Sequence, residues 1–182
     1  NHYDVSNFAS QGNSNKKGFK KNLFAKKIFN LFYVGLKKKY LKKQMTRIYR
    51  SKQQENARNL CIEFFESRLD SVLRRAKFCS TIKDARQLIT HQHIYVNKKI
   101  ETNYSYILKQ GDLIQINLQS RKIIKTKLDN QFKACFDSIF WPMVPSYLNV
   151  NYITFDIIFG NIKNFNFSAF FNFKNAELYM LF

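Results

Sequence analysis

Cysteine, proline, glycine and acidic residues are all scarce in this sequence. The 182 residues include 3 cysteines, 2 prolines, 5 glycines and 12 acidic residues. The cysteines, Cys61, Cys79 and Cys135, are odd in number and far apart, which argues against a disulfide framework and against a zinc finger. No glycine-rich cofactor loop follows Leu118. We therefore expect reduced cysteines, no bound metal and no cofactor.

A long, uninterrupted apolar run is also missing. Residues 138–155 carry no charge, but proline, serine and asparagine interrupt them at Pro142, Pro145, Ser146, Asn149 and Asn151. These residues make a poor membrane span, so we expect no transmembrane helix.

Basic residues dominate the charge. The chain has 31 lysines and arginines and a formal net charge of +19. Residues 1–60 hold fifteen of these cations against two acids, whereas residues 134–182 hold two lysines against three acids. Such a charge attracts polyanions, so nucleic acid is the leading partner class and an anionic membrane the second.

Phenylalanine, isoleucine, asparagine, lysine and tyrosine together make 88 of the 182 residues. Because the codons of these five amino acids are built largely from A and T, the composition indicates an AT-rich gene, as organellar genomes often carry. An AT-rich nuclear genome is the alternative.

The length allows one or two domains. Residues 1–18 are polar with little periodicity and predict an extended arm. Residues 19–66 show apolar residues at helical spacing between lysines and predict three basic helices, at about 19–32, 35–50 and 57–65.

Residues 67–118 give the clearest pattern, two short helices followed by a small antiparallel sheet. Ser67 with Asp70, and Thr81 with Asp84, have the spacing of helix caps. Each helix has one apolar face, formed by Leu69, Val72, Leu73 and Ala76 in the first and by Ile82, Ala85, Leu88 and Ile89 in the second. Ile94 and Val96 then alternate as in a strand, with turns at 97–98 and 110–112, and Ile114, Ile116 and Leu118 alternate in the last strand.

Residues 119–182 complete the chain. A basic connector at 120–134 can form a short helix, and the aromatic remainder predicts short strands and loops that cover the core and pack on the helical lobe. The fold class expected for the whole chain is α+β.

Residues 67–118 resemble the RNA-binding domain that is named after the small-subunit ribosomal protein four family. The resemblance is carried by RLD at 68–70, ARQLI at 85–89, the pattern H-x-x-I-x-V-N at 91–97 and GD at 111–112. Upstream, KKQMTRIYR at 42–50 resembles the family's basic aromatic helix. Downstream, PSYLNVNYITFDIIF at 145–159 and ELY at 177–179 are similar to its later strands.

Two departures from the family are visible. Lys98 stands where the family usually has glycine after Asn97, which affects the shape of the turn. The cysteines that form a zinc site in some members are absent, so the resemblance carries no metal site over.

The resemblance implies a structural RNA-binding protein of the small ribosomal subunit, located at a junction of rRNA helices and next to neighbouring small-subunit proteins near the mRNA entrance. With the composition, it favours a mitochondrion, with a plastid as the second choice. No membrane and no small-molecule substrate are expected as partners. The motif positions place these residues on the RNA surface: Arg68, Arg75, Lys77, Ser80, Thr81, Lys83, Arg86, Gln87, His91 and Asn97, with Lys98 and Lys99 as second-rank candidates. For Gln87 and Asn97, a role in turn or cap structure is an alternative.

Two other functions fit parts of the pattern. The same small domain occurs in RNA-modifying enzymes, and RLD is similar to the motif around the catalytic aspartate of pseudouridine synthases. However, RLD lies inside the binding helix here and only 64 residues follow Leu118, too few for a catalytic domain, so we expect no enzyme. A free-standing ribosome-rescue factor is the other alternative, although its long aromatic end would suit a free monomer poorly.

Overall fold

The computed structural model describes residues 38–50, 57–136 and 144–162, and in addition residues 20, 23, 27, 33, 35 and 36. Its helices are α2 (Lys38–Arg50), α3 (Ala57–Glu66), α4 (Leu69–Arg75), α5 (Ile82–Thr90) and α6 (Leu118–Phe136). Its strands are β1 (Ile94–Val96), β2 (Lys99–Ile100), β3 (Leu113–Ile116), β4 (Leu148–Asn151) and β5 (Asp156–Phe159). The predicted arm at 1–18, most of the helix predicted at 19–32 and the segment ELY at 177–179 lie outside the described residues. The α+β class is confirmed.

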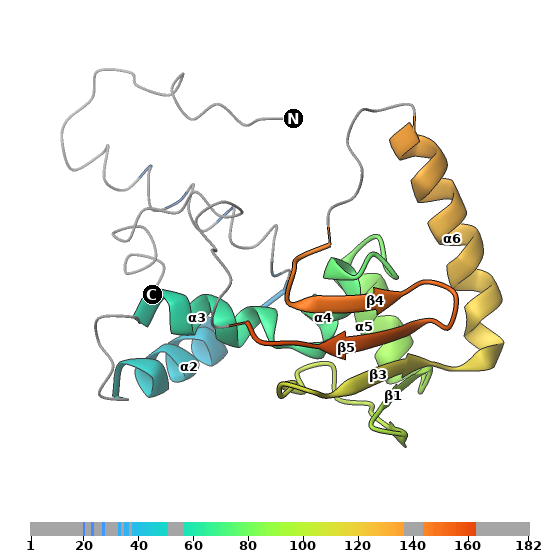
Figure 1. The fold of residues 1–182 in the computed structure, drawn as a ribbon. Coiled ribbons are helices and arrows are strands. Elements are labelled where there is room, and N and C mark those ends of the chain that lie inside the picture. Colours follow the sequence, from blue (N-terminus) through green and yellow to red (C-terminus); the bar gives the residue numbers. More distant parts are fainter. Residues whose placement is uncertain are drawn as a thin grey trace.

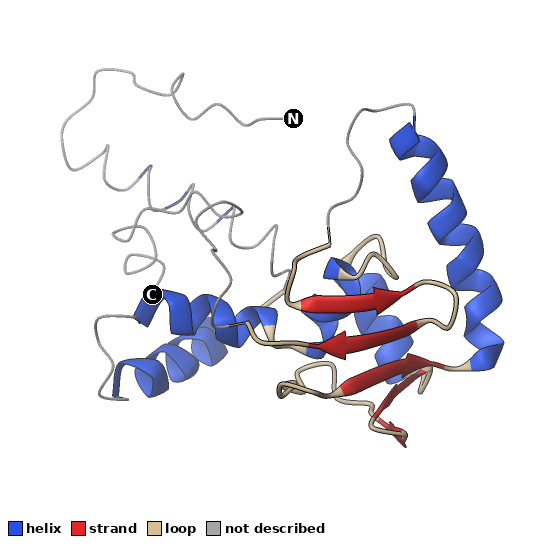
Figure 2. Cartoon of the chain, viewed as in Figure 1, coloured by secondary structure: helices blue, strands red, loops and turns tan. Residues whose placement is uncertain are grey.

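The strands form an antiparallel sheet in the order β2-β1-β3-β5-β4. Helices α4 and α5 lie against one face of this sheet, while α2 and α3 lie side by side beyond one end of the strands and α6 stands beyond the other (Figure 1). The other sheet face looks toward the viewer in Figure 2, and there the described part of the chain adds no helix.

The aromatic part of the chain contributes β4 and β5, as the sequence predicts for short strands. These strands extend the same sheet instead of lying over it, because β5 pairs with β3. Ile157 stands opposite Ile114 in this pairing, and both side chains are fully buried. The sheet thus contains strands from the predicted small domain at 67–118 and strands from the segment that follows it.

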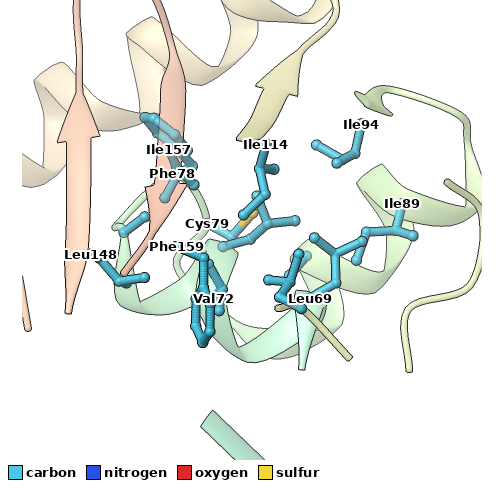
Figure 3. Close-up of a cluster of buried hydrophobic side chains, with 14 of the residues drawn as sticks. Leu69, Val72, Phe78, Cys79, Ile89, Ile94, Ile114, Leu148, Ile157 and Phe159 are labelled. Atoms are coloured by element: carbon cyan, nitrogen blue, oxygen red, sulfur yellow. The ribbon is translucent and has the colours of Figure 1, made fainter. Parts of the chain in front are cut away.

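The core lies between the sheet and the helix pair α4 and α5. Leu69 and Val72 of α4 and Ile89 of α5 point toward Ile94 and Ile114 of the sheet, with Phe78 and Cys79 of the connecting segment among them (Figure 3). The predicted apolar faces of both helices are confirmed, since Leu69, Val72, Leu73, Ala76, Ala85 and Ile89 are fully buried and Ile82 nearly so. Burial of an aliphatic side chain of this size stabilises the fold by about 1.5–3 kcal/mol.

The two predicted helix caps differ in outcome. Thr81 caps α5: its Oγ1 accepts a hydrogen bond from the Asp84 amide at 3.2 Å, and the Asp84 carboxylate accepts one from the Thr81 amide at 3.2 Å. Ser67 does not cap α4, so that prediction is wrong. Its amide and hydroxyl both donate to the Glu63 carbonyl, at 2.8 and 2.5 Å, and thus continue the hydrogen bonding of α3. Arg68 takes the N-cap position, without a side-chain cap bond.

The hairpin between β1 and β2 turns at Asn97 and Lys98. Val96 pairs with Lys99, and the two turn residues have φ angles of +50° and +65°. Positive φ at both central residues matches the twist of the flanking strands and is the geometry for which glycine is favoured. Lys98 therefore adopts the turn conformation that glycine adopts more easily.

The basic connector predicted at 120–134 is part of the 19-residue helix α6, which begins at Leu118. The prediction that Leu118 alternates with Ile114 and Ile116 in the strand is wrong, because Leu118 begins α6 and is 73% exposed. The strand ends at Ile116, and Ser120, Ile124 and Leu128 then form the buried face of the helix at a spacing of four residues.

The second and third predicted helices are found as α2 and α3, but only α2 is basic, because α3 holds one arginine against two glutamates. Leu41 of α2 is buried, as are Ile62 and Phe65 of α3. The lysines at 39, 42 and 43 of α2 are exposed. The helix that leads directly into α4 is thus α3, and most basic residues of this pair lie on α2.

Candidate nucleic-acid interface

Helix α5 presents a polar, cationic stripe away from the core. Lys83, Gln87 and Thr90 are exposed at i, i+4 and i+7, which places them on one side of the helix. Arg86 lies beside them with a side chain 20% exposed, and exposed His91 follows at the C-cap. The helix has this face because its apolar residues all turn to the opposite side. Four of the residues predicted for the RNA surface are therefore brought together: Lys83, Arg86, Gln87 and His91.

The β1–β2 turn adds two further cations. Lys98 and Lys99 are exposed at the end of the hairpin. Asn97 is exposed as well, but its side chain bonds within the protein: Nδ2 donates to Asp112 Oδ1 at 2.9 Å, and Oδ1 accepts from the Leu113 amide at 3.0 Å. These bonds tie the turn to the start of β3. They support the structural alternative for Asn97, and RNA contact by this residue stays a prediction.

The segment before α5 contains three more of the predicted residues. Ser80 and Thr81 are exposed, and Lys77 is half-buried with a φ of +65°. The Thr81 oxygen accepts the cap bond, which leaves its hydroxyl hydrogen available to a ligand. All three lie on the connection that leads into the N-terminus of α5.

Asp70 is a buried carboxylate that gathers two of the predicted arginines. It is 1% exposed and accepts from Arg68 Nε at 3.0 Å, Arg68 Nη2 at 2.8 Å and Arg86 Nε at 2.9 Å. The Ser71 amide also donates to it, at 3.0 Å. Because a buried carboxylate needs such partners, Asp70 is a structural residue at the junction of α4 and α5.

Arg68 does not lie on the surface, contrary to expectation. Its side chain is 1% exposed, and besides Asp70 it donates to the Tyr40 hydroxyl at 3.0 Å. Burial would lower the pKa of Arg68, but its hydrogen bonds and the charge of Asp70 raise it, so the guanidinium is a fixed internal cation. The physical reason is topological, because Arg68 links α3 to α4 and forms a β-bridge with Ile107 that covers it.

Glu66, at the end of α3, is the second buried carboxylate. It is 1% exposed and accepts from Arg75 Nε at 2.9 Å, from Arg75 Nη2 at 2.7 Å and from the hydroxyl of Tyr147 at 2.8 Å. The Tyr33 hydroxyl also donates to it. Burial and the charge of Glu66 raise the pKa of both tyrosines, so their hydroxyls remain donors. Arg75, with 18% of its side chain exposed, is thus largely an internal ion-pair partner.

Sequence reasoning missed Glu66, Tyr147 and Tyr104. Glu66 and Tyr147 are 81 residues apart, and no local pattern links them. The ring of Tyr104 lies under Arg86, with 5.1 Å from Cζ to the ring centroid. Nothing in the local sequence singles out Glu66, because α3 also contains Glu63 and its only basic residue is Arg58.

The structure offers little for other classes of site. His91 and His93 stack with ring centroids 6.2 Å apart, but the described residues contain no group of three side chains that could hold a metal ion. The pKa of the Cys79 thiol is raised to about 12, mainly by burial; the charge of Asp84 raises it further and that of Lys127 lowers it. This thiol is therefore protonated at neutral pH. No helix in the described ranges is long and apolar enough to cross a membrane.

Comparison with known proteins gives a consistent group of relatives. Residues 67–114 match the family of the "S4 domain". The chain is 34% identical over 142 residues to small ribosomal subunit protein uS4m of Marchantia polymorpha, covering 78% of this chain and 68% of that protein. It is 39% identical over 110 residues to small ribosomal subunit protein uS4 of Aquifex aeolicus, covering 59% and 51%. It is also 39% identical over 104 residues to uS4m of Dictyostelium citrinum, covering 57% and 30%. The chain thus spans about half the length of the Aquifex relative and less than a third of the Dictyostelium one.

Proposed function

Since this chain belongs to the small ribosomal subunit protein uS4 family, we propose that it is a structural constituent of a small ribosomal subunit that binds and organises the subunit's rRNA. The observation that carries the proposal is the set of exposed or partly exposed polar and cationic residues on α5, at its two caps and in the β1–β2 turn, which we call the α5–turn surface. Its members are Thr81, Lys83, Arg86, Gln87, His91, Lys98 and Lys99.

Charge and shape of this surface suit folded RNA. Among the described residues, the ion pairs involve Arg68, Arg75 and Arg86, whereas none involves Lys83, Lys98 or Lys99. These lysines are therefore available to phosphates, which supply most of the affinity for a nucleic acid. Amide, imidazole and hydroxyl groups between them suit the backbone and the irregular regions of folded RNA.

Two observations support the location that we propose. Relatives named uS4m occur in Marchantia polymorpha, Dictyostelium citrinum and Reclinomonas americana. The abundance of residues with A- and T-rich codons fits an organellar gene. We place the protein in the mitochondrial ribosome, with neighbouring small-subunit proteins as further partners.

A catalytic role does not fit the one motif that suggested it. Asp70, the aspartate of RLD, is 1% exposed and bound by two arginines, so it is inaccessible to a nucleotide. The proposed role is structural.

The proposal is tested by measuring how salt affects the binding of the full chain to a transcript of the small-subunit rRNA of the proposed mitochondrial ribosome. We expect Lys83→Ala and Lys99→Ala each to weaken binding and to reduce the slope of log K against log salt by about 0.9, or somewhat less on non-duplex RNA. Lys125→Ala, which removes the same charge from exposed α6, is the matched control and should change the slope little. Equal effects of all three variants, or no effect of the first two, would contradict the assignment of the α5–turn surface.

A further inference from the structure

Arg86 is held on several sides, by Asp70 of the RLD motif and by two residues outside the motifs. Its Nε donates to Asp70 at 2.9 Å. Its Cζ lies 5.1 Å from the ring centroid of Tyr104. A Cβ added to Gly35 would lie 3.1 Å from Arg86 Nη1, so the guanidinium also lies close to this glycine. Nη1 and Nη2 donate to no acceptor among the residues that the structure describes.

The loop that carries Tyr104 is itself fixed to the start of α4. The Leu69 amide donates to the Tyr106 carbonyl at 2.9 Å, and the Leu108 amide donates to the Ser67 carbonyl at 2.8 Å. The Asp70 amide approaches the Tyr104 carbonyl at 3.4 Å. The ring under Arg86 and the carboxylate at its edge are therefore positioned by the same segment, although Tyr104 follows Arg86 by 18 residues.

These contacts fix the orientation of the Arg86 guanidinium through Nε and through its face, and they leave Nη1 and Nη2 as donors for a ligand. An arginine bound through Nε still has Nη donors in the geometry of a fork, which matches two oxygens of a phosphate. A side chain ordered before binding loses less conformational freedom when the ligand arrives. Tyr104, 39% exposed, lies against the guanidinium face, and 20% of the Arg86 side chain remains exposed.

We infer that Asp70, Tyr104 and Arg86 form a pre-set fork for one backbone phosphate of the bound RNA, with Arg86 as the contact and Tyr104 as a positioning residue. This inference rests on the proposed function and adds a specific phosphate contact to it. It distinguishes Arg86 from Lys83, Lys98 and Lys99, whose flexible ammonium groups attract phosphates without a fixed geometry.

A double-mutant cycle with the full chain and the same rRNA transcript tests the inference. Tyr104→Leu should weaken binding about two- to fivefold, as expected for loss of a cation–π contact. Tyr104→Phe, which keeps the aromatic ring, should bind with native affinity. In an Arg86→Lys background, which retains a cation beside Asp70 but lacks the fork, Tyr104→Leu should have no further effect. Thermal unfolding followed by circular dichroism verifies that each variant is folded.

The outcomes separate this inference from the proposed function. An equal loss from Tyr104→Leu in both backgrounds would show that the ring contacts RNA directly, and would overturn the positioning role. No loss from Tyr104→Leu, while Lys83→Ala and Lys99→Ala still weaken binding, would overturn the inference and leave the proposed function standing. If none of these variants changed the affinity, both would fail.

Discussion

Lys98 shows how a single residue can have a structural disadvantage and a functional use. Its φ of +65° costs free energy for a residue with a side chain, whereas glycine adopts this conformation without that cost. Its ammonium is exposed at the turn next to Lys99, where a phosphate can reach it. We interpret the lysine as a charge gained at the expense of turn stability.

Two substitutions at residue 98 separate these effects. Lys98→Gly should raise the free energy of unfolding by about 0.5–1 kcal/mol, because it relieves the left-handed strain. Lys98→Ala should not raise it, since alanine keeps the strain. Both should weaken rRNA binding equally, because both remove the charge. Urea unfolding and salt-dependent binding measure the two quantities, and a stability gain in both variants would disprove the strain argument.

Single residues also show the limit of sequence reasoning at the site. The motif positions placed Arg68 and Lys83 on the same RNA surface, yet one is buried and the other exposed. Periodicity predicts which side of a helix a residue occupies, and it succeeded for Lys83 within α5. It could not predict that the chain before α4 is covered by residues around Ile107, because that contact joins segments about forty residues apart.

Helix α5 is the element that carries most of the proposed surface, and its local signals agree with one another. The capping box at Thr81 and Asp84, the apolar stripe and the polar stripe were all visible in the sequence, and the cap and the apolar stripe are confirmed in the structure. By contrast, the predicted helix at 120–134 was short whereas α6 has 19 residues, and the place of β5 in the sheet was not predicted. The residues of β5 have evident strand propensity, but the choice of β3 as their partner is a long-range event that propensity does not encode.

The cap of α5 gives an element-scale prediction. Thr81→Ala removes the acceptor for the Asp84 amide and should lower the free energy of unfolding by about 1 kcal/mol. Thr81→Ser keeps the acceptor and is the matched control, with stability close to native. Chemical denaturation measures both. If the alanine variant were as stable as the serine variant, the capping box would not contribute to stability.

At the scale of the whole molecule, buried charges connect the helices and exposed charges are available to bind RNA. Buried Glu66 and Asp70 join α2, α3, α4, α5 and the segment before β4 through Tyr40, Arg68, Arg75, Arg86 and Tyr147. Exposed lysines remain outside this internal network. Since acids are few, 12 against 31 basic residues, those that are buried neutralise only a small part of the charge. The chain remains a strongly cationic body, which a polyanion such as rRNA is suited to bind.

Sedimentation of the native protein tests the central claim most directly. A mitochondrial extract from the source organism is separated on a density gradient, and the chain is located with an antibody or by mass spectrometry. The account predicts that the protein migrates with the small ribosomal subunit and remains there at moderate salt, since many contacts with rRNA are made together. Migration at the top of the gradient as a free protein, or association that is lost at moderate salt, would contradict a structural role in the subunit.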